Sequence, residues 1–372
     1  MREVSLSSFE AFKDTRANAT GNALEFEISS KQWDYGLALP LSGFWQKLPK
    51  VVEADVEIKS GIVRVECLDL KSHGECGGKV TLTAPFRGKV RVLLEKSAGR
   101  PVLMVRNAAA DGGRALGALH SVARLDNVDA AEFRRLKAGT WDYWHYSYDL
   151  GEGARVEATI DGIMPMHRLN QKIMFHLLKT GFGDISGKRI VDVACASGFH
   201  TMEMARQGAR MVGVDIDGPS IEQARFLQQC SDVKAVRDIR FELSGLHGFK
   251  PPEPFDIGFC SGLFYHLLDP VGGAQALFNL VKEGAVVHSH IVDSDEAIMA
   301  LADSSKYKCC FDGEFALMPS RSMLERIFAH VGFKVKSFSP RDVVSDAEIE
   351  SLAPEFSTLF ASGNTAYYLL TK

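Results

Sequence analysis

The sequence predicts an α/β protein: a Rossmann-like, mostly parallel, seven-stranded sheet with helices on both faces, preceded by an N-terminal β-sandwich-like domain. Three observations support this prediction. The chain has 372 residues, which is too long for one compact core and fits two domains. From about residue 23 to 122, apolar residues alternate with charged ones, as in half-buried strands. After about residue 151, short apolar runs alternate with helical patterns, as in a parallel sheet.

The expected strands of the N-terminal part are short and separated by turn residues. Apolar alternation is clearest at 52–58, 63–67 and 80–84, and β-rich runs follow at 90–94 and 102–105. The expected turns are Ser60-Gly61, Gly77-Gly78, Arg87-Gly88 and Gly99-Arg100-Pro101. Strands that repeat with turns every ~8–12 residues favour a β-sandwich. A short connecting helix is expected at 126–137.

In the C-terminal part, strands and helices are expected to alternate. The first elements are a helix at 164–179, a strand at 189–193, a helix ending at 206, a strand at 211–215 and a helix at 219–229. Further strands are expected at 240–243, 255–260 and 285–290, then an amphipathic helix at 322–330 and closing strands at 335–338 and 367–370. We therefore expect an accessory domain at 1–128, a connecting helix and aromatic segment at 129–163, and a Rossmann-like domain at 164–372.

Composition narrows the class of protein. The net charge is −4, and no clustered basic stripe is apparent, so a nucleic-acid partner is not favoured. No stretch reaches the roughly 18 apolar residues of a membrane span, and the polar N-terminus does not resemble a secretory signal. The seven cysteines include no CxxC pair, which indicates a reducing, cytoplasmic setting without a disulfide framework or zinc site. No metal site is expected.

The stretch from Ile190 to Asp217 carries the expected cofactor site. The strand at 189–193 contains Asp192, and the small residues Ala194, Ala196, Ser197 and Gly198 follow before a helix begins. Small side chains at this turn let the backbone approach a ligand at the carboxyl end of the sheet. The next strand ends in an acid, Asp215, which in such folds accepts hydrogen bonds from ribose hydroxyls.

A nicotinamide cofactor would need the GxGxxG turn, because its pyrophosphate lies on the helix N-terminus. Only Gly198 of that pattern is present. S-adenosylmethionine (SAM) has no phosphate, so its turn can tolerate Ala194 and Ala196. Asp192 also suits the cationic ammonium and sulfonium of this molecule. The sequence therefore predicts SAM as the cofactor.

These residues resemble motif I of the class I SAM-dependent methyltransferases, with Asp192 as the motif acid, Asp215 as the ribose acid and Ala194 where a glycine is usual. Segments 144–153, 255–270 and 318–333 resemble the branch that contains the tRNA wobble-uridine carboxymethyltransferases. The resemblance covers about residues 141–372. It implies that Leu243 and Ser244 flank the adenine and that Cys260 and Ser261 face the methionine portion. Ile216, which follows Asp215, is a further candidate cofactor contact.

His266 is the candidate general base, because it follows the fourth strand of the sheet by a few residues and ligands bind at that edge. The alternative is a loop histidine that packs on Tyr265 or caps a helix. His200 is expected to line the cofactor pocket. His288 and His290, two residues apart on a strand, share a face and are expected to be hydrogen-bonded within the sheet, with a substrate contact by one of them as the alternative.

An aromatic run at 141–148 precedes the Rossmann-like domain and could either cover a ring substrate or pack the linker against the sheet. The loop at 306–318 could form a second wall or simply connect two elements. The expected acceptor contacts are Trp144, His145, Tyr265 and Phe315.

Together these observations predict a SAM-dependent O-methyltransferase acting on a sugar, glycan or small metabolite, with N-methylation left open. One alternative is a transferase that modifies the tRNA wobble uridine. A second is a non-catalytic SAM-binding protein, which Ala194 keeps open.

Overall fold

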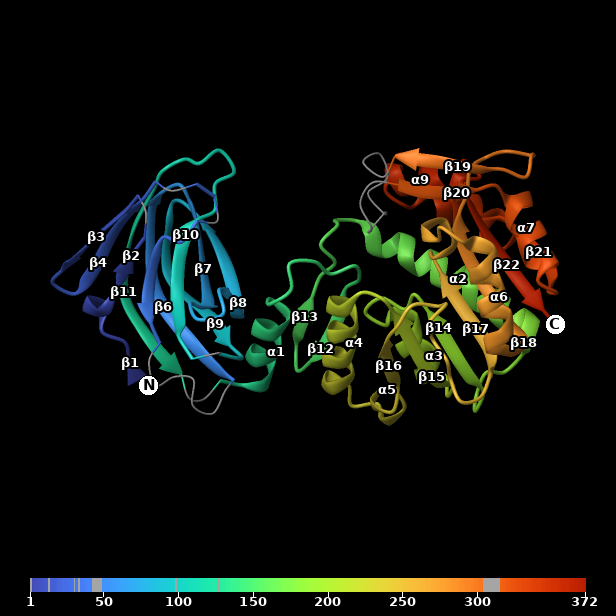
Figure 1. Ribbon diagram of the computed structural model, residues 1–372, viewed down its shortest axis with the longest axis horizontal. Coiled ribbons are helices and arrows are strands. Elements are labelled where there is room, and N and C mark those ends of the chain that lie inside the picture. The colour runs from blue at the N-terminus through green and yellow to red at the C-terminus, as the bar shows by residue number, and fades with distance from the viewer. Residues whose placement is uncertain are drawn as a thin grey trace. The chain divides into compact units, whose positions relative to one another are not determined.

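The structure is a computed structural model and describes residues 2–12, 14–29, 31–32, 34–41, 49–97, 99–125, 128–303 and 315–372. Contacts between Cα atoms divide the chain into two compact units. Met1–Asp142 and Asp149–Val156 form the N-terminal unit, and Tyr143–Tyr148 and Glu157–Lys372 form the C-terminal unit. The elements of both are labelled in Figure 1.

The N-terminal unit is built almost entirely of strands. Its elements are β1 (Arg2–Glu3), η1 (Leu6–Ser8), β2 (Glu10–Ala11), β3 (Thr15–Thr20), β4 (Ala23–Ile28), β5 (Leu37–Pro40), β6 (Lys50–Ser60), β7 (Ile62–Asp69), β8 (Gly74–Thr83), β9 (Phe86–Leu94), β10 (Pro101–Asn107), β11 (Ala115–Leu125) and α1 (Ala130–Ala138). A small sheet of β12 (Tyr148–Gly151) and β13 (Ala154–Val156) follows.

The strands of this unit form one eleven-stranded sheet in the order β2-β5-β10-β7-β8-β9-β6-β11-β4-β3, with β1 beside β11. Its strand pairs are antiparallel. Leu39 and Val65 from one half of this order share a single buried core with Leu24 and Val56 from the other half. The two halves of this order are joined at the register pair Gly77–Leu94 of β8 and β9 and share that core. The expected sandwich-like arrangement stays a prediction.

Two of the expected turns lie inside strands. Gly77-Gly78 belongs to β8 and Arg87-Gly88 to β9. Gly77 is needed for a close approach, because a Cβ there would lie 1.8 Å from the Leu93 carbonyl oxygen of β9. A glycine that permits two strands to meet was thus mistaken for a turn. The strand stretches expected at 52–58, 63–67, 90–94 and 102–105 are confirmed, and the stretch expected at 80–84 belongs to β8 as far as Thr83.

The C-terminal unit alternates strands and helices. Its elements are α2 (Ile163–Phe182), β14 (Arg189–Val193), α3 (Phe199–Arg206), β15 (Arg210–Asp215), α4 (Gly218–Cys230), α5 (Lys234–Arg237), β16 (Arg240–Leu243), β17 (Phe255–Ser261), η2 (Phe264–His266), α6 (Pro270–Leu280), β18 (Val281–His290), β19 (Met299–Asp303), β20 (Phe315–Pro319), α7 (Arg321–His330), β21 (Lys334–Phe338), η4 (Pro340–Asp342), α8 (Asp346–Glu350), α9 (Pro354–Ala361) and β22 (Thr365–Thr371).

Its main sheet has seven strands in the order β16-β15-β14-β17-β18-β22-β21. The first five are mutually parallel, and β22 is antiparallel to both of its neighbours. Each strand expected from the sequence in this part is present. Because the carboxyl ends of parallel strands meet at one edge, residues after β14, β15, β16 and β17 gather there.

Helices cover both faces of this sheet. Val287 of β18 lies in a core cluster with Leu277 of α6 and Leu324 of α7. The next residue, His288, points to the opposite face, since side chains alternate along a strand. There it lies 3.3 Å from Ser261 Oγ, which also accepts a hydrogen bond from Asn170 of α2. Figure 1 shows α6 and α7 together on one side.

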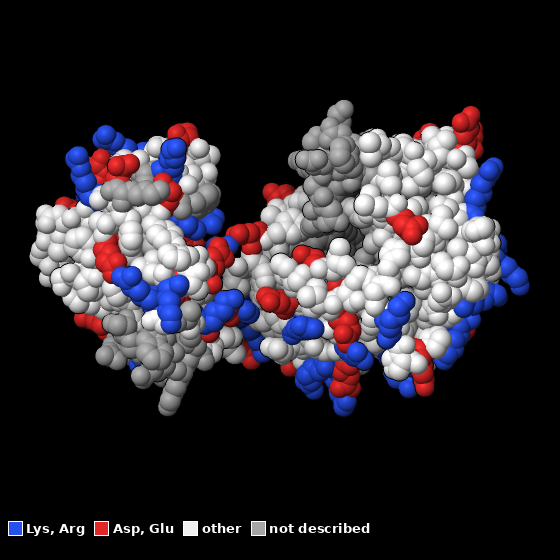
Figure 2. Space-filling view, in the orientation of Figure 1, with Lys and Arg blue, Asp and Glu red and all other residues white. Residues whose placement is uncertain are grey.

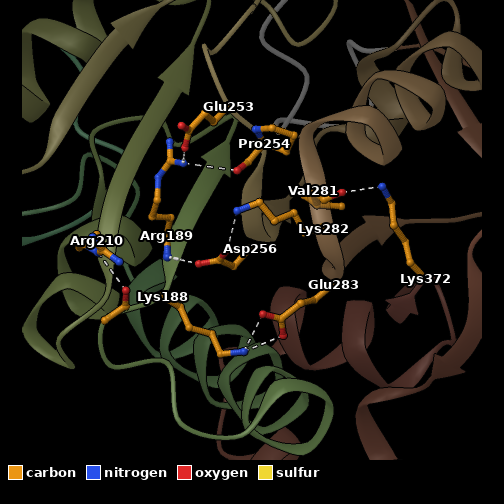
Figure 3. A network of polar contacts seen from close by, with 11 residues as sticks. Lys188, Arg189, Arg210, Glu253, Pro254, Asp256, Val281, Lys282, Glu283 and Lys372 are labelled. Carbon is orange, nitrogen blue, oxygen red and sulfur yellow. Dashed lines mark hydrogen bonds and ion pairs between the residues drawn. The ribbon is translucent and has the colours of Figure 1, made fainter.

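Ion pairs and hydrogen bonds tie the amino ends of the central strands together (Figure 3). Lys188, just before β14, pairs with Glu283 of β18 at 2.6 Å. The Arg189 backbone N–H donates to the Asp256 carboxylate of β17 at 2.8 Å, and Lys282 of β18 contacts the same carboxylate at 3.3 Å. The edge opposite the carboxyl ends is therefore fixed by contacts between neighbouring strands.

Some elements differ from expectation. The expected connecting helix is α1, which begins at Ala130, and residues 126–127 lie outside the described residues. Of the loop expected at 306–318, residues 306–314 lie outside the described residues, and Phe315 begins β20, which pairs with β19. Among the described residues, no helix is both long and apolar enough to cross a membrane.

Candidate active site

The turn between β14 and α3 has an unusual backbone. Ala194 and Ala196 have φ values of 60° and 45°, in the left-handed region that favours glycine. Gly198 has a φ of 83° and its N–H donates to the Cys195 carbonyl at 2.9 Å. A Cβ on Gly198 would lie 2.8 Å from the Phe241 ring, so this position requires glycine. The turn keeps a glycine-type path although two of its residues are alanine.

Asp215, at the end of β15, holds this turn in place. Its Oδ2 accepts a hydrogen bond from the Ala196 N–H at 2.8 Å, and its Oδ1 accepts one from the Asp217 N–H at 2.9 Å. Burial raises the pKa of this carboxyl, and the backbone N–H groups act in the opposite direction. Each carboxylate oxygen can accept a further hydrogen bond, so Asp215 can both shape the turn and bind two hydroxyls.

Asp192 lies beneath the turn and is only 1% exposed. Its carboxylate accepts a hydrogen bond from Thr201 Oγ1 of α3 at 2.5 Å. Burial raises the pKa of Asp192 to about 7, and the nearby Asp215 raises it further, whereas Thr201 lowers it. A carboxyl of this kind ionises readily when a cation is placed beside it.

Two large apolar side chains are open to solvent next to Asp215. Ile216 is 65% exposed and Leu243, at the end of β16, is 58% exposed. Leu243 is the register partner of Asp215, so the two strand ends lie side by side. Ser244 follows, and its N–H donates to the Asp215 carbonyl at 2.9 Å. This surface can pack against a flat ring beside the carboxylate.

At the end of β17, two of the predicted site residues point to opposite faces of the sheet. The side chain of Cys260 is fully buried in the core shared with α6 and α7. Ser261 points to the other face, where Asn170 Nδ2 donates to its Oγ at 3.1 Å and His288 Nδ1 lies 3.3 Å away. His288 Nε2 in turn lies 2.9 Å from Thr365 Oγ1. Ser261 is thus part of a polar chain, and Cys260 presents only its backbone at this edge.

The aromatic run at 143–148 packs against the motif turn. Tyr148 Oη lies 2.9 Å from Ser197 Oγ and donates to the Ser197 carbonyl at 3.1 Å. The Tyr146 ring stacks on Phe199, with centroids 4.6 Å apart and planes 7° from parallel. At the other end, Gln223 Nε2 of α4 donates to the Tyr143 carbonyl at 2.6 Å. The run therefore bridges α4 and α3 beside the turn. Trp144 is buried within it, against Tyr148.

His266 is half-buried at the end of η2, beyond β17. Its ring centroid is 4.2 Å from that of Tyr265, which lies 5.0 Å from the ring of His290 on β18. The imidazoles of His266 and His290 are close enough to interact electrostatically, and burial together with this neighbour lowers the pKa of His290 to about 4. Phe315 begins β20, and its side chain lies outside the described residues.

The structure brings histidines of several elements close to α2. His145 of the aromatic run lies 4.5 Å, ring to ring, from His167 of α2. His200 of α3 lies 3.4 Å from Gln171 Nε2 of the same helix α2. His167 and Asn170 were missed, and the available signal was their spacing of three on an otherwise apolar helix face. Among the described residues, no group of three His, Cys, Asp or Glu residues is arranged to hold a metal.

A strand, a glycine-type turn, a helix and an acid at the end of the next strand define a Rossmann-like nucleoside-binding site. A family profile described as "Methyltransferase domain" matches residues 184–338. The ubiquinone biosynthesis O-methyltransferase of Neisseria meningitidis serogroup C is 30% identical over 173 residues, covering 44% of this chain and 71% of that protein. The chain therefore belongs to the class I SAM-dependent methyltransferases.

A second curated relative agrees with this assignment. The ubiquinone biosynthesis O-methyltransferase of Klebsiella pneumoniae is 30% identical over 163 residues, which cover 43% of this chain and 60% of the relative. The chain thus spans about two thirds of the length of the curated relatives it matches. A SAM-dependent methyltransferase structure from Mesorhizobium loti aligns with 17% identity and a TM-score of 0.43, covering 55% of this chain and 100% of that one. The family profile begins at residue 184.

Proposed function

We propose that this protein transfers the methyl group of SAM to a hydroxyl oxygen of a small molecule or glycan. The proposal depends on one observation. His266, which lies beside Tyr265 and His290, comes just after β17, at the same edge of the sheet as the turn that Asp215 holds. The relatives named O-methyltransferases support oxygen as the acceptor atom. On the face shown in Figure 2, Lys and Arg are interspersed with Asp and Glu rather than gathered into a stripe.

The residues present fit SAM, which supplies a methyl group on a sulfonium. Asp215 would accept hydrogen bonds from the ribose hydroxyls with the lone pairs that its backbone contacts leave. The exposed side chains of Ile216 and Leu243, with Ser244 beside them, would pack along the adenine. Asp192 would ionise and face the cationic end. The backbone from Ala194 to Gly198 would approach the ligand, with Ser261 and the Cys260 backbone near the amino-acid portion.

His266 would take the proton of the acceptor hydroxyl, whose oxygen would bond to the methyl carbon. The bond from that carbon to sulfur would break, with S-adenosylhomocysteine as the leaving group. Tyr265 would orient the imidazole of His266 through the ring contact at 4.2 Å. Trp144 and His145 would cover the acceptor, and Phe315 would lie at its far side. The buried aromatic run would exclude water from the reacting atoms. We assign residues 164–372 to catalysis, 129–163 to the connection and cover, and 1–128 to an accessory domain.

The test is methyl transfer from ¹³C-methyl-labelled SAM to a panel of hydroxylated metabolites and glycosides, followed by NMR of the new methyl group. We expect an O-methyl product, and His266→Ala should cut turnover ~10²–10⁴-fold while SAM affinity stays nearly unchanged. His330→Ala, at the exposed end of α7, is the matched control and should retain full turnover. If His266→Ala loses thermal stability but keeps its activity per folded molecule, the residue only packs. Label found on nitrogen would contradict the oxygen assignment.

A further inference from the structure

The inner face of α2 carries two buried polar side chains that the proposed chemistry does not use. His167 is 5% exposed and Asn170 is 4% exposed. Residues three apart on a helix are neighbours on one face. Asn170 Nδ2 donates to Ser261 Oγ at the end of β17, so this face of α2 looks onto the carboxyl edge of the sheet. His167 lies one turn closer to the start of the helix.

Within the part of the chain that the structure describes, Asn170 Oδ1 and His167 Nε2 are buried without a hydrogen-bond partner. Asn170 Nδ2 donates to Ser261 Oγ at 3.1 Å, and Oδ1 is the atom of this amide that remains unfilled. Burying a polar atom without a partner destabilises a protein. A ligand can supply the missing bond to such an atom, and these two residues lie on the face of α2 that looks onto the ligand-binding edge.

The chemistry of the two atoms determines which groups can be their hydrogen-bond partners. Asn170 Oδ1 is an acceptor and needs a donor. Burial lowers the pKa of His167 well below its usual value, and the imidazoles of His145 and His200 lower it further, so the ring is neutral. A hydroxyl can donate or accept, and therefore suits His167 Nε2 in either tautomer. A carboxylate or phosphate would bring only acceptors to Asn170.

We infer that His167 and Asn170 bind two neighbouring hydroxyl groups of the methyl acceptor, which makes the acceptor a vicinal diol, either aromatic or on a sugar ring. This inference rests on the proposed function for the identity of the site. The two residues determine specificity: one turn of α2 holds both hydroxyls beside Ser261. The rings of His145 and Tyr146 pack against His167, with centroids 4.5 Å from that of its ring.

The test measures binding rather than turnover, with the full chain loaded with S-adenosylhomocysteine. The probes are two pairs: catechol with phenol, and methyl α-D-mannopyranoside with its 2-deoxy analogue. We expect one diol to bind roughly tenfold more tightly than its partner with one hydroxyl fewer, because one hydrogen bond is lost. His167→Phe keeps an aromatic ring and Asn170→Leu keeps the approximate shape. Each should abolish that preference while S-adenosylhomocysteine binds as before.

His176→Phe, on the exposed face of the same helix, is the control and should keep the preference. The melting temperature of His167→Phe should equal or exceed that of the wild type, because the variant removes an unfilled polar atom; a large fall would overturn the inference. So would a wild type without preference for either diol. A tenfold loss of S-adenosylhomocysteine affinity in either variant would assign the two atoms to the cofactor. If the diol preference is found and methyl transfer is not, the proposed function fails and the diol site stands.

Discussion

Replacing Ala194 or Ala196 with glycine should stabilise this protein, although glycine normally weakens a fold. Both alanines have positive φ values, 60° and 45°. In this conformation a residue with a Cβ destabilises the folded state by about 1–2 kcal/mol. Glycine removes this strain, but it also gives the unfolded chain more conformational freedom, which lowers the free energy of unfolding by about 0.4–1 kcal/mol. Each substitution should therefore raise the free energy of unfolding by about 0.5–1 kcal/mol.

The assay is equilibrium denaturation, with the transition of the C-terminal unit identified by its shift on adding SAM. Ala224→Gly is the matched control: it makes the same chemical change inside α4, at a fully buried residue. It should destabilise by about 1–2 kcal/mol, from helix propensity and lost methyl burial. The reasoning is refuted if all three variants lose stability alike. SAM affinity should stay within about threefold in both turn variants, since only the backbone approaches the ligand.

Asp215→Ala should weaken SAM binding by about 1.5–3 kcal/mol in calorimetry. The control Asp217→Ala removes only the cap of α4 and should leave SAM binding unchanged. An unchanged dissociation constant in Asp215→Ala would remove the ribose assignment. The stability of the SAM-free wild type relative to Asp192→Asn should fall as pH rises from about 4 to 7, because burial raises the pKa of Asp192 to about 7 and the folded state therefore holds that proton more tightly than the unfolded chain. The buried histidines, whose pKa values burial lowers, act in the opposite direction in both proteins and cancel in this difference; a difference that does not change with pH would show that Asp192 does not titrate in this range. A fragment starting at residue 129 should fold and bind SAM, since the residues assigned to the cofactor lie at 192–261; an insoluble fragment would make the N-terminal strands part of the catalytic fold.

Local patterns were sufficient for the elements around the cofactor site. The strand at 189–193, the small-residue turn and Asp215 follow one another in the chain, and each leaves a local mark: apolar residues in a row, small side chains, then an acid. Cys260 and Ser261 looked equivalent in sequence, but strand alternation buries one and exposes the other to α2. The orientation could be known only once α6 and α7 were placed on one face.

Long-range contacts account for what the sequence could not predict. Asn170 meets Ser261 across 91 positions of the chain, and no periodicity marks that partnership. The left-handed backbone of Ala194 could not be predicted, because glycine is the residue that normally indicates a positive φ and alanine rarely adopts one. Gly77 was wrongly predicted to lie in a turn, because glycine is favoured both in turns and where two strands approach too closely for a Cβ.

The ion pairs from Lys188 to Glu283 and from Lys282 to Asp256 have a consequence for engineering. They lock strand register at the amino ends, away from every residue proposed to touch a ligand. Substitutions at the opposite rim can therefore alter which molecule is recognised without loosening the strands beneath. A library for altered recognition should therefore vary the residues of α2, η2 and the aromatic run that are not part of the buried core, and leave the amino ends of the strands unchanged.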